Sequence, residues 1–195
     1  MLEKGKFLEK TNFIVFLFII LFSSSLFSQT TISKIFKYNT SLRNSSALFI
    51  QNDGTDIQEG KIFFGEKRIK INYENPQKIT LILSEKKGVY INHELEESQY
   101  FNTNKSYVSF FFKILNGDKF LEKPTVQENS IELNNSFNIS DVNYKIKIVY
   151  ENNPIKIRKI IVLENDEKLE ISFFNHNNLE SFEKNFFSMI NPYLN

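Results

Sequence analysis

The chain is dominated by short runs in which apolar β-branched or aromatic residues alternate with polar ones. The clearest run is NYKIKIVY, residues 143–150, and turn compositions such as NDGTD, ENPQ and ENNP separate the runs from one another. Alternation places every second side chain on the same face of an extended strand. The pattern therefore predicts an antiparallel sheet whose strands are joined by short turns, with one apolar face.

About ten strands are expected. The runs that predict them are 46–51, 60–64, 68–73, 78–84, 88–92, 124–134, 137–140, 143–150, 155–164 and 168–174.

Two stretches have helical spacing instead. Residues 31–42 repeat apolar positions at intervals of three and four, and so does the stretch 104–118, which ends at an Asn-Gly pair. We expect a short amphipathic helix in each. The tail from residue 178 could form a further helix that ends before Pro192.

The first 28 residues differ in composition from the rest. Three lysines precede ten apolar residues, FIVFLFIILF, and a run of three serines follows. This order is typical of a secretory signal peptide, and the run is shorter than the ~20 residues that span a bilayer. We expect cleavage after Ser25 or Ser28, with an uncleaved anchor as the alternative. Residues 1–28 are thus interpreted as a signal peptide and residues 29–195 as one curved β domain.

Charge and cysteine content exclude several classes of protein. Removal of residues 1–28 takes away three of 24 basic and two of 23 acidic side chains, which leaves 21 of each. The signs are interleaved, so no basic surface suited to nucleic acid is predicted. The chain has no cysteine, so neither a disulfide nor a lipid anchor on cysteine is available, and the core must supply the stability.

A sheet of this size raises the question of what fills its concave side. Ten strands in one twisted sheet enclose an apolar face, and two or three short helices look too few to fill it. A ligand cavity is one outcome. A dry, solidly packed core is the other, because close packing is the usual state of protein interiors.

The order of the segments resembles the periplasmic lipoprotein carrier family, LolA. The resemblance rests on the leading helix and on IQEGKIFF, RIKINYENP, KITLILSEKKGVYIN and ELEESQYF, followed by the helix YVSFFFKIL. Within these runs Gly60, Pro76 and Gly88 stand where the family pattern has a glycine-led strand, a proline turn and a hairpin. The similarity is clearest over residues 58–101.

The resemblance implies an incomplete, strongly curved antiparallel barrel with a helical lid over an apolar cavity. It further implies a periplasmic chaperone that takes acylated lipoproteins from an inner-membrane ABC transporter and passes them to an outer-membrane receptor. We expect a monomer without cofactors. The lipid-binding residues expected from the strand and helix faces are Ile69, Ile71, Tyr73, Leu81, Leu83, Phe111, Phe112 and Leu115.

One departure concerns the arginine that helps to close the lid in the family. The family places an Arg-Pro pair before its aromatic strand, whereas this chain has FGEKRIKI, which lacks the proline and is one residue shorter. Arg68 or Lys67 stands at the corresponding position. We therefore treat Arg68 as a lid-closing candidate only.

Other kinds of site are weakly supported. HELEE contains His93, but His93 and Glu94 would point to opposite faces of a strand, and the other histidine, His176, is 83 positions away. No nucleophile or nucleotide-binding motif is present. We expect no metal site, no catalytic residue and no nucleic-acid partner. Two alternatives stay open, an envelope β domain that binds another lipid or a protein helix, and a hydrolase with paired carboxylates.

Overall fold

The computed structural model describes residues 31–116, 124–139, 141–165, 167–178 and 181–194. The expected signal peptide, residues 1–28, lies outside these ranges. Residues 31–41 are helical, and two further helical elements are η1 (Thr103–Lys105) and α2 (Val108–Asn116). No described helix is both long enough and apolar enough to cross a membrane.

Eleven antiparallel strands form a single sheet. They are β1 (Ser45–Asn52), β2 (Ile57–Phe64), β3 (Ile69–Asn75), β4 (Ile79–Leu83), β5 (Lys87–Asn92), β6 (Glu97–Asn102), β7 (Thr125–Val126), β8 (Ser130–Ile139), β9 (Val142–Asn152), β10 (Ile155–Glu164) and β11 (Glu167–Asn177).

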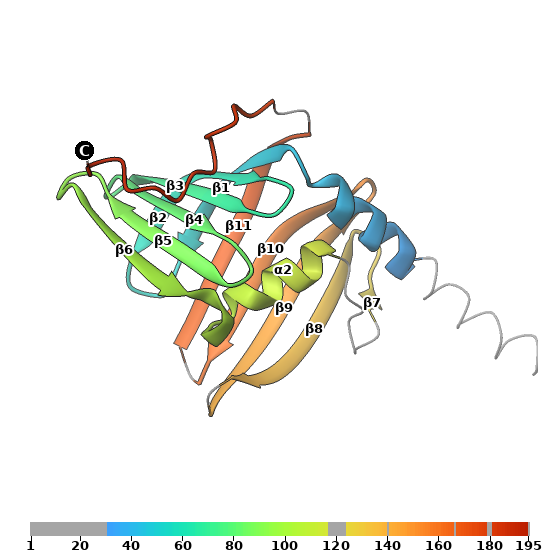
Figure 1. Ribbon diagram of the computed structural model, residues 1–195. Coiled ribbons are helices and arrows are strands. Elements are labelled where there is room, and N and C mark those ends of the chain that lie inside the picture. Colours follow the sequence, from blue (N-terminus) through green and yellow to red (C-terminus); the bar gives the residue numbers. More distant parts are fainter. Residues whose placement is uncertain (1–30, 117–123, 140, 166, 179–180, 195) are drawn as a thin grey trace, which may run out of the picture.

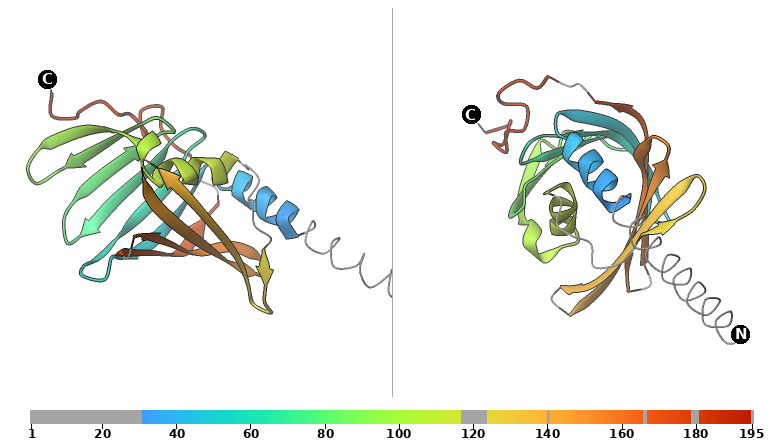
Figure 2. Two further views of the ribbon diagram at one scale, coloured as in Figure 1. Left: turned by 90° about the horizontal axis from the view of Figure 1, so that it is seen from below. Right: turned by 90° about the vertical axis from the view of Figure 1, so that its right-hand side faces the viewer.

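The sheet consists of two meanders joined at one seam. Its strand order is β6-β5-β4-β3-β2-β1-β11-β10-β9-β8-β7, so every neighbour is consecutive in the chain except β1 and β11. In Figures 1 and 2 it curls around the helix 31–41 and α2 without closing on itself. The predicted incomplete, strongly curved antiparallel barrel is confirmed.

The strand boundaries differ from the prediction in two places. Residues 97–102 form β6, which the alternating runs did not include, and the two predicted strands 124–134 and 137–140 are instead the short β7 and the long β8. Both predicted helices are present, over 31–41 and Val108–Asn116.

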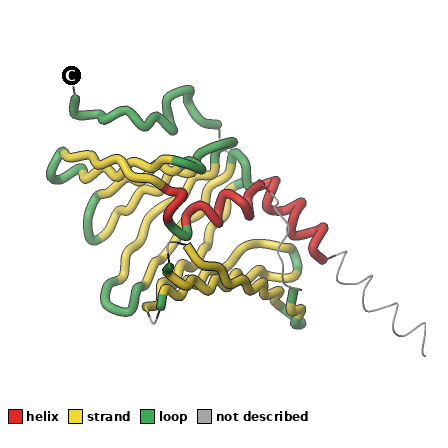
Figure 3. Tube along the Cα trace, turned by 60° about the horizontal axis from the view of Figure 1, so that its bottom comes forward, coloured by secondary structure: helices red, strands yellow, loops and turns green. Residues whose placement is uncertain are grey.

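The two helices cover the concave face of the sheet (Figure 3). Tyr38 and Asn39 of the helix 31–41 reach Tyr150 of β9: the two tyrosine rings lie edge to face at 6.1 Å, and the Tyr150 hydroxyl donates to Oδ1 of Asn39 at 3.2 Å. Helix α2 packs Phe110 against Phe137 of β8, with ring centroids 5.0 Å apart. Both helices are thus held against the β8–β9 side of the sheet.

The tail, residues 181–194, covers the outer face of the sheet along β2–β6, as the dark red trace in Figure 1 shows. Met189 and Tyr193 pack against a small buried cluster formed by Ile82, Val89 and Ile91. The predicted tail helix is wrong, because these residues form turns with no regular helix. Contacts with the sheet override the local helical spacing of the tail.

Candidate functional site

An apolar cavity of about 340 Å³ lies between the helices and the concave face of the sheet. Its floor comes from β1–β4, β6, β10 and β11, and its cover comes from residues 39 and 42, from residues 106 and 107, and from α2. Because β3 and β4 pair in register, Ile69 faces Leu83, and Ile71 faces Leu81. The regular pairing of strands with alternating apolar residues therefore gives the cavity a continuous apolar floor.

Six of the eight predicted lipid-binding residues line this cavity. They are Ile69, Ile71, Tyr73, Leu81, Leu83 and Phe111. Phe112 is buried but lines a neighbouring, more polar pocket. The side chain of Leu115 lies outside the part of the chain that the structure describes.

The cavity also has lining residues that the strand pattern did not identify. The aromatic residues among them are Phe49, Phe64, Phe101, Tyr107 and Phe173. Phe101 could have been identified from the glycine that it faces on the neighbouring strand. Its ring lies over Gly88 of β5, where a β-carbon would collide with it. A glycine facing an aromatic residue across two strands leaves space that the ring fills.

The polar groups of the cavity are few and neutral. The Tyr73 hydroxyl donates to Oε1 of Gln51 at 3.0 Å, and the Gln51 amide donates to Oε1 of Gln58 at 3.1 Å. Burial raises the pKa of Tyr73 and of Tyr107 above the usual tyrosine range. None of the described lining residues is Asp, Glu, Lys, Arg or His. An apolar ligand fits this lining better than a charged one.

Arg68 points away from the cavity. Its Nη1 donates to the carbonyl of Phe187 in the tail at 2.5 Å, and no hydrogen bond among the described residues joins it to α2. The structure thus links Arg68 to the outer cover of the sheet. Its lid-closing role stays a prediction.

The histidines lie apart from each other and from the cavity. His93 follows β5, and its two ring nitrogens lie 2.9 Å from Thr80 Oγ1 and 2.8 Å from the Tyr193 hydroxyl. His176 lies on β11 with Nε2 3.0 Å from the carbonyl of Ile157. Among the described residues, no group of three or more His, Cys, Asp or Glu side chains could hold a metal ion.

Comparison with known proteins gives similarity of fold. No protein-family model matches the chain, and no curated protein sequence matches it. An uncharacterized conserved protein from Thermus thermophilus matches with a TM-score of 0.53 and 6% sequence identity, over 82% of this chain and 92% of that chain. This likeness establishes a shared fold only.

Two weaker structural matches add nothing to that conclusion. LprF from Mycobacterium bovis has a TM-score of 0.40 at 9% identity, over 76% of this chain and 92% of that chain. PNGF-II has a TM-score of 0.40 at 7% identity, over 74% of this chain and 29% of that chain. The resemblance to the lipoprotein carrier family therefore stays an expectation from the sequence.

Proposed function

We propose that the protein is a periplasmic chaperone that binds the acyl chains of lipoproteins in the apolar cavity and carries them from the inner to the outer membrane. The observation that carries the proposal is the cavity of about 340 Å³, whose described lining is uncharged and includes six of the residues predicted to hold lipid. On this proposal the donor is an inner-membrane ABC transporter and the acceptor an outer-membrane receptor.

The size of the cavity bears on how cargo would be held. A methylene group is about as large as a water molecule, so about 340 Å³ has room for at least roughly a dozen methylenes, which is one acyl chain of moderate length. Several acyl chains need more space than that. A lipoprotein with several acyl chains therefore requires the helical cover to move away from the sheet.

Such movement would also tune the affinity. Burying an acyl chain contributes about 0.8 kcal/mol per methylene, so ~20 methylenes approach ~16 kcal/mol, close to the practical limit of non-covalent binding. A carrier that bound so tightly would not release its cargo. Separating Phe111 of α2 from the sheet face that it covers offsets part of this gain.

A binding role is favoured over hydrolysis by the same lining. A hydrolase needs polar groups that converge on the substrate inside a pocket. The hydroxyl of Tyr73 is engaged by Gln51, and the described lining offers no carboxylate, histidine or lysine. We therefore propose that the protein is a carrier and not an enzyme.

The test is release of an acylated protein from membranes. Membrane vesicles that hold an acylated lipoprotein are incubated with the full chain and removed by centrifugation, and the soluble lipoprotein is measured. We expect release with the unaltered chain and none with Ile71→Glu, because a buried carboxylate in the floor opposes acyl binding.

The matched control is Ile57→Glu, which makes the same substitution on β2 at a side chain that is 66% exposed. It should release lipoprotein as the unaltered chain does. If Ile71→Glu folds and still carries the lipoprotein, the cavity is not the cargo site.

A further inference from the structure

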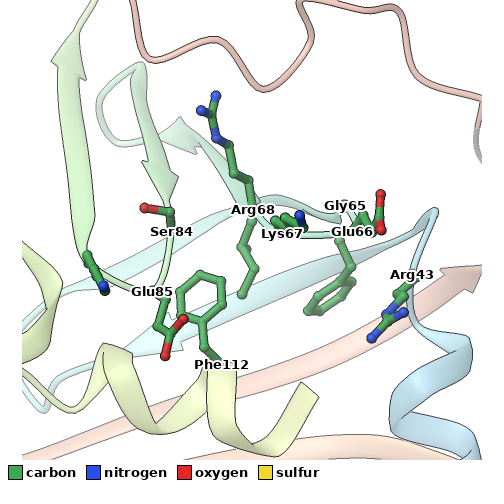
Figure 4. A pocket seen from close by; sticks show the side chains of 11 residues that line it. Arg43, Gly65, Glu66, Lys67, Arg68, Ser84, Glu85 and Phe112 are labelled. Carbon is green, nitrogen blue, oxygen red and sulfur yellow. The ribbon is translucent and has the colours of Figure 1, made fainter. Parts of the chain in front are cut away.

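A second pocket opens directly beside the apolar cavity. It has a volume of about 450 Å³ and is built from Arg43 after the helix 31–41, the β2–β3 turn 65–68, the β4–β5 turn 84–86 and Phe112. Figure 4 shows Arg43 on one side of this pocket, Ser84 and Glu85 on the other, and Phe112 rising from α2 below. We call these residues the rim.

The rim and the cavity share walls. Phe64 and Ile69 line both the cavity and the rim pocket. Two consecutive residues of α2 are divided between the two spaces: Phe111 lines the cavity, and Phe112 lines the rim pocket. A chain lying along the cavity floor can therefore end at the rim. The group at the end of that chain would then lie among the charged side chains of the rim, outside the uncharged lining of the cavity.

The rim carries an excess of positive charge. Its lining includes four cations, Arg43, Lys67, Arg68 and Lys86, and two acidic residues, Glu66 and Glu85. Without Arg68, whose guanidinium is bound to the tail, the net charge of the lining is +1. The ion pairs found among the described residues involve none of these four cations. The Arg68 side chain extends from the rim toward the tail, where its Nη1 donates to the carbonyl of Phe187, so its guanidinium lies away from the pocket (Figure 4).

We propose that the cavity and the rim together bind a single-chain anionic amphiphile, with the acyl chain on the cavity floor and a carboxylate or phosphate head at the rim. This inference rests on the proposed acyl-binding function and adds the negative charge of the ligand's head group. Lysine and arginine side chains hydrogen-bond and neutralise both kinds of anionic head. A cavity of about 340 Å³ has room for one chain of roughly a dozen carbons.

The first experiment compares dodecanoate, dodecanol and dodecylammonium by calorimetric titration of the full chain at pH 8 and low salt. These ligands share one chain and differ in the charge of the head. We expect dodecanoate to bind about tenfold more tightly than dodecanol, with dodecylammonium weakest, and the difference to shrink as salt is added. Equal binding of dodecanoate and dodecanol overturns the inference and leaves the acyl cavity intact.

The second experiment reverses two rim charges. Lys67→Glu combined with Lys86→Glu should weaken dodecanoate about tenfold or more and leave the dodecanol affinity unchanged. The control combines Lys145→Glu with Lys78→Glu, which reverses two charges at exposed positions away from the rim, and should alter neither affinity. An equal effect of the control and the rim variant would attribute the preference to net charge and overturn the inference.

Two further arms separate the sources of failure. Inorganic phosphate should compete only weakly with dodecanoate, and tight phosphate binding to the Ile71→Glu variant would make the rim a free-anion site and overturn the amphiphile inference. If neither dodecanoate nor dodecanol binds, or if Ile71→Glu leaves both affinities unchanged, the proposed acyl-binding function itself fails.

Discussion

The two sides of the sheet share one sequence pattern but have different interiors. On β9 the alternating residues Ile146, Ile148 and Tyr150 are 2%, 1% and 0% exposed, and none of them lines the cavity. On β3 the equivalent residues Ile71 and Tyr73 are only partly buried and face the hollow space. Alternation thus determines which face is apolar, and the covering helices determine whether that face is filled.

The outer faces differ as well. The ion pairs on the described residues lie on β8–β11. Three join neighbouring strands, Lys147 with Glu132, Arg158 with Glu151 and Lys159 with Glu170, and the fourth, Lys168 with Glu170, lies within β11.

The outer face of β2–β6 is instead covered by the tail. Phe186 of the tail packs edge to face on Phe63 at 4.9 Å, and Nζ of Lys70 lies 4.2 Å from the centre of the Phe186 ring. The hollow side is therefore supported from outside by an aromatic cover, whereas the filled side has a solvated polar surface.

The largest expected difference concerns truncation of the inner apolar residues. Ile148→Ala should lower the free energy of unfolding by about 3 kcal/mol, because it leaves a void in a fully packed region. Ile71→Ala should cost only about 1 kcal/mol, since one side of Ile71 already faces empty space. Urea unfolding of both variants measures this difference, and equal losses would contradict the division into a filled and a hollow side.

Removal of the tail should have the next largest effect. Deletion of residues 181–195 exposes the outer cluster of Ile82, Val89 and Ile91, and we expect a loss of about 2 kcal/mol after the regained freedom of the tail is counted. Thermal unfolding measures the loss. Alanine at Ile190, which is 77% exposed, is the matched control and should leave the melting temperature unchanged.

Alkaline pH tests whether the cavity is dry. Burial raises the pKa of Tyr150 and of Tyr73 above the ordinary value of about 10. The folded state then holds these protons more tightly than the unfolded state, so the resulting stability is complete below about pH 10 and is lost as the pH rises toward the folded pKa. Each tyrosine contributes a slope of up to about 1.4 kcal/mol per pH unit.

Substitution separates the two contributions. Tyr150→Phe and Tyr73→Phe should each reduce the slope of unfolding free energy against pH between about 10 and 11, measured by urea unfolding. If only Tyr150→Phe reduces the slope, water reaches Tyr73 and the cavity is wet in the empty protein.

The smallest expected effect belongs to the surface ion pairs. Glu132→Gln removes the partner of Lys147, whose Nζ lies 3.0 Å from the carboxylate, and should cost less than about 1 kcal/mol because both side chains are solvated. The loss should disappear in 1 M salt. A cost as large as that of Ile148→Ala would show that the outer face, and not the packed interior, stabilises the filled side.

Much of the architecture could be predicted from local pattern. Alternation identified the inner residues of β3, β4 and β9, and spacing of three and four identified α2, because both signals depend only on the local backbone period. β6 was not predicted from alternation because ESQYFN has few apolar residues, and only its pairing with β5 defines it.

The parts that failed depend on distant contacts. The tail was predicted as a helix, but its aromatic residues meet β2–β6, which lie about a hundred residues earlier in the chain. For the same reason the helical spacing assigned Phe112 to the cavity together with Phe111, whereas Phe112 lines the rim pocket with residues 65–68 and 84–86. A periodic pattern shows which face of a helix or strand is apolar. Which residues pack against that face depends on the rest of the fold.

The seam between β1 and β11 sets an order of assembly. β1–β6 are consecutive hairpins and emerge first during synthesis, yet β1 finds its second neighbour only when residues 167–177 have been made. Until then the backbone amides and carbonyls along one edge of β1 have no strand partner, and the nascent chain presents an unguarded β edge. The strands β1–β4, which supply much of the cavity floor, are thus translated before β11, and that last strand must arrive before the edge of β1 is protected against pairing with other chains.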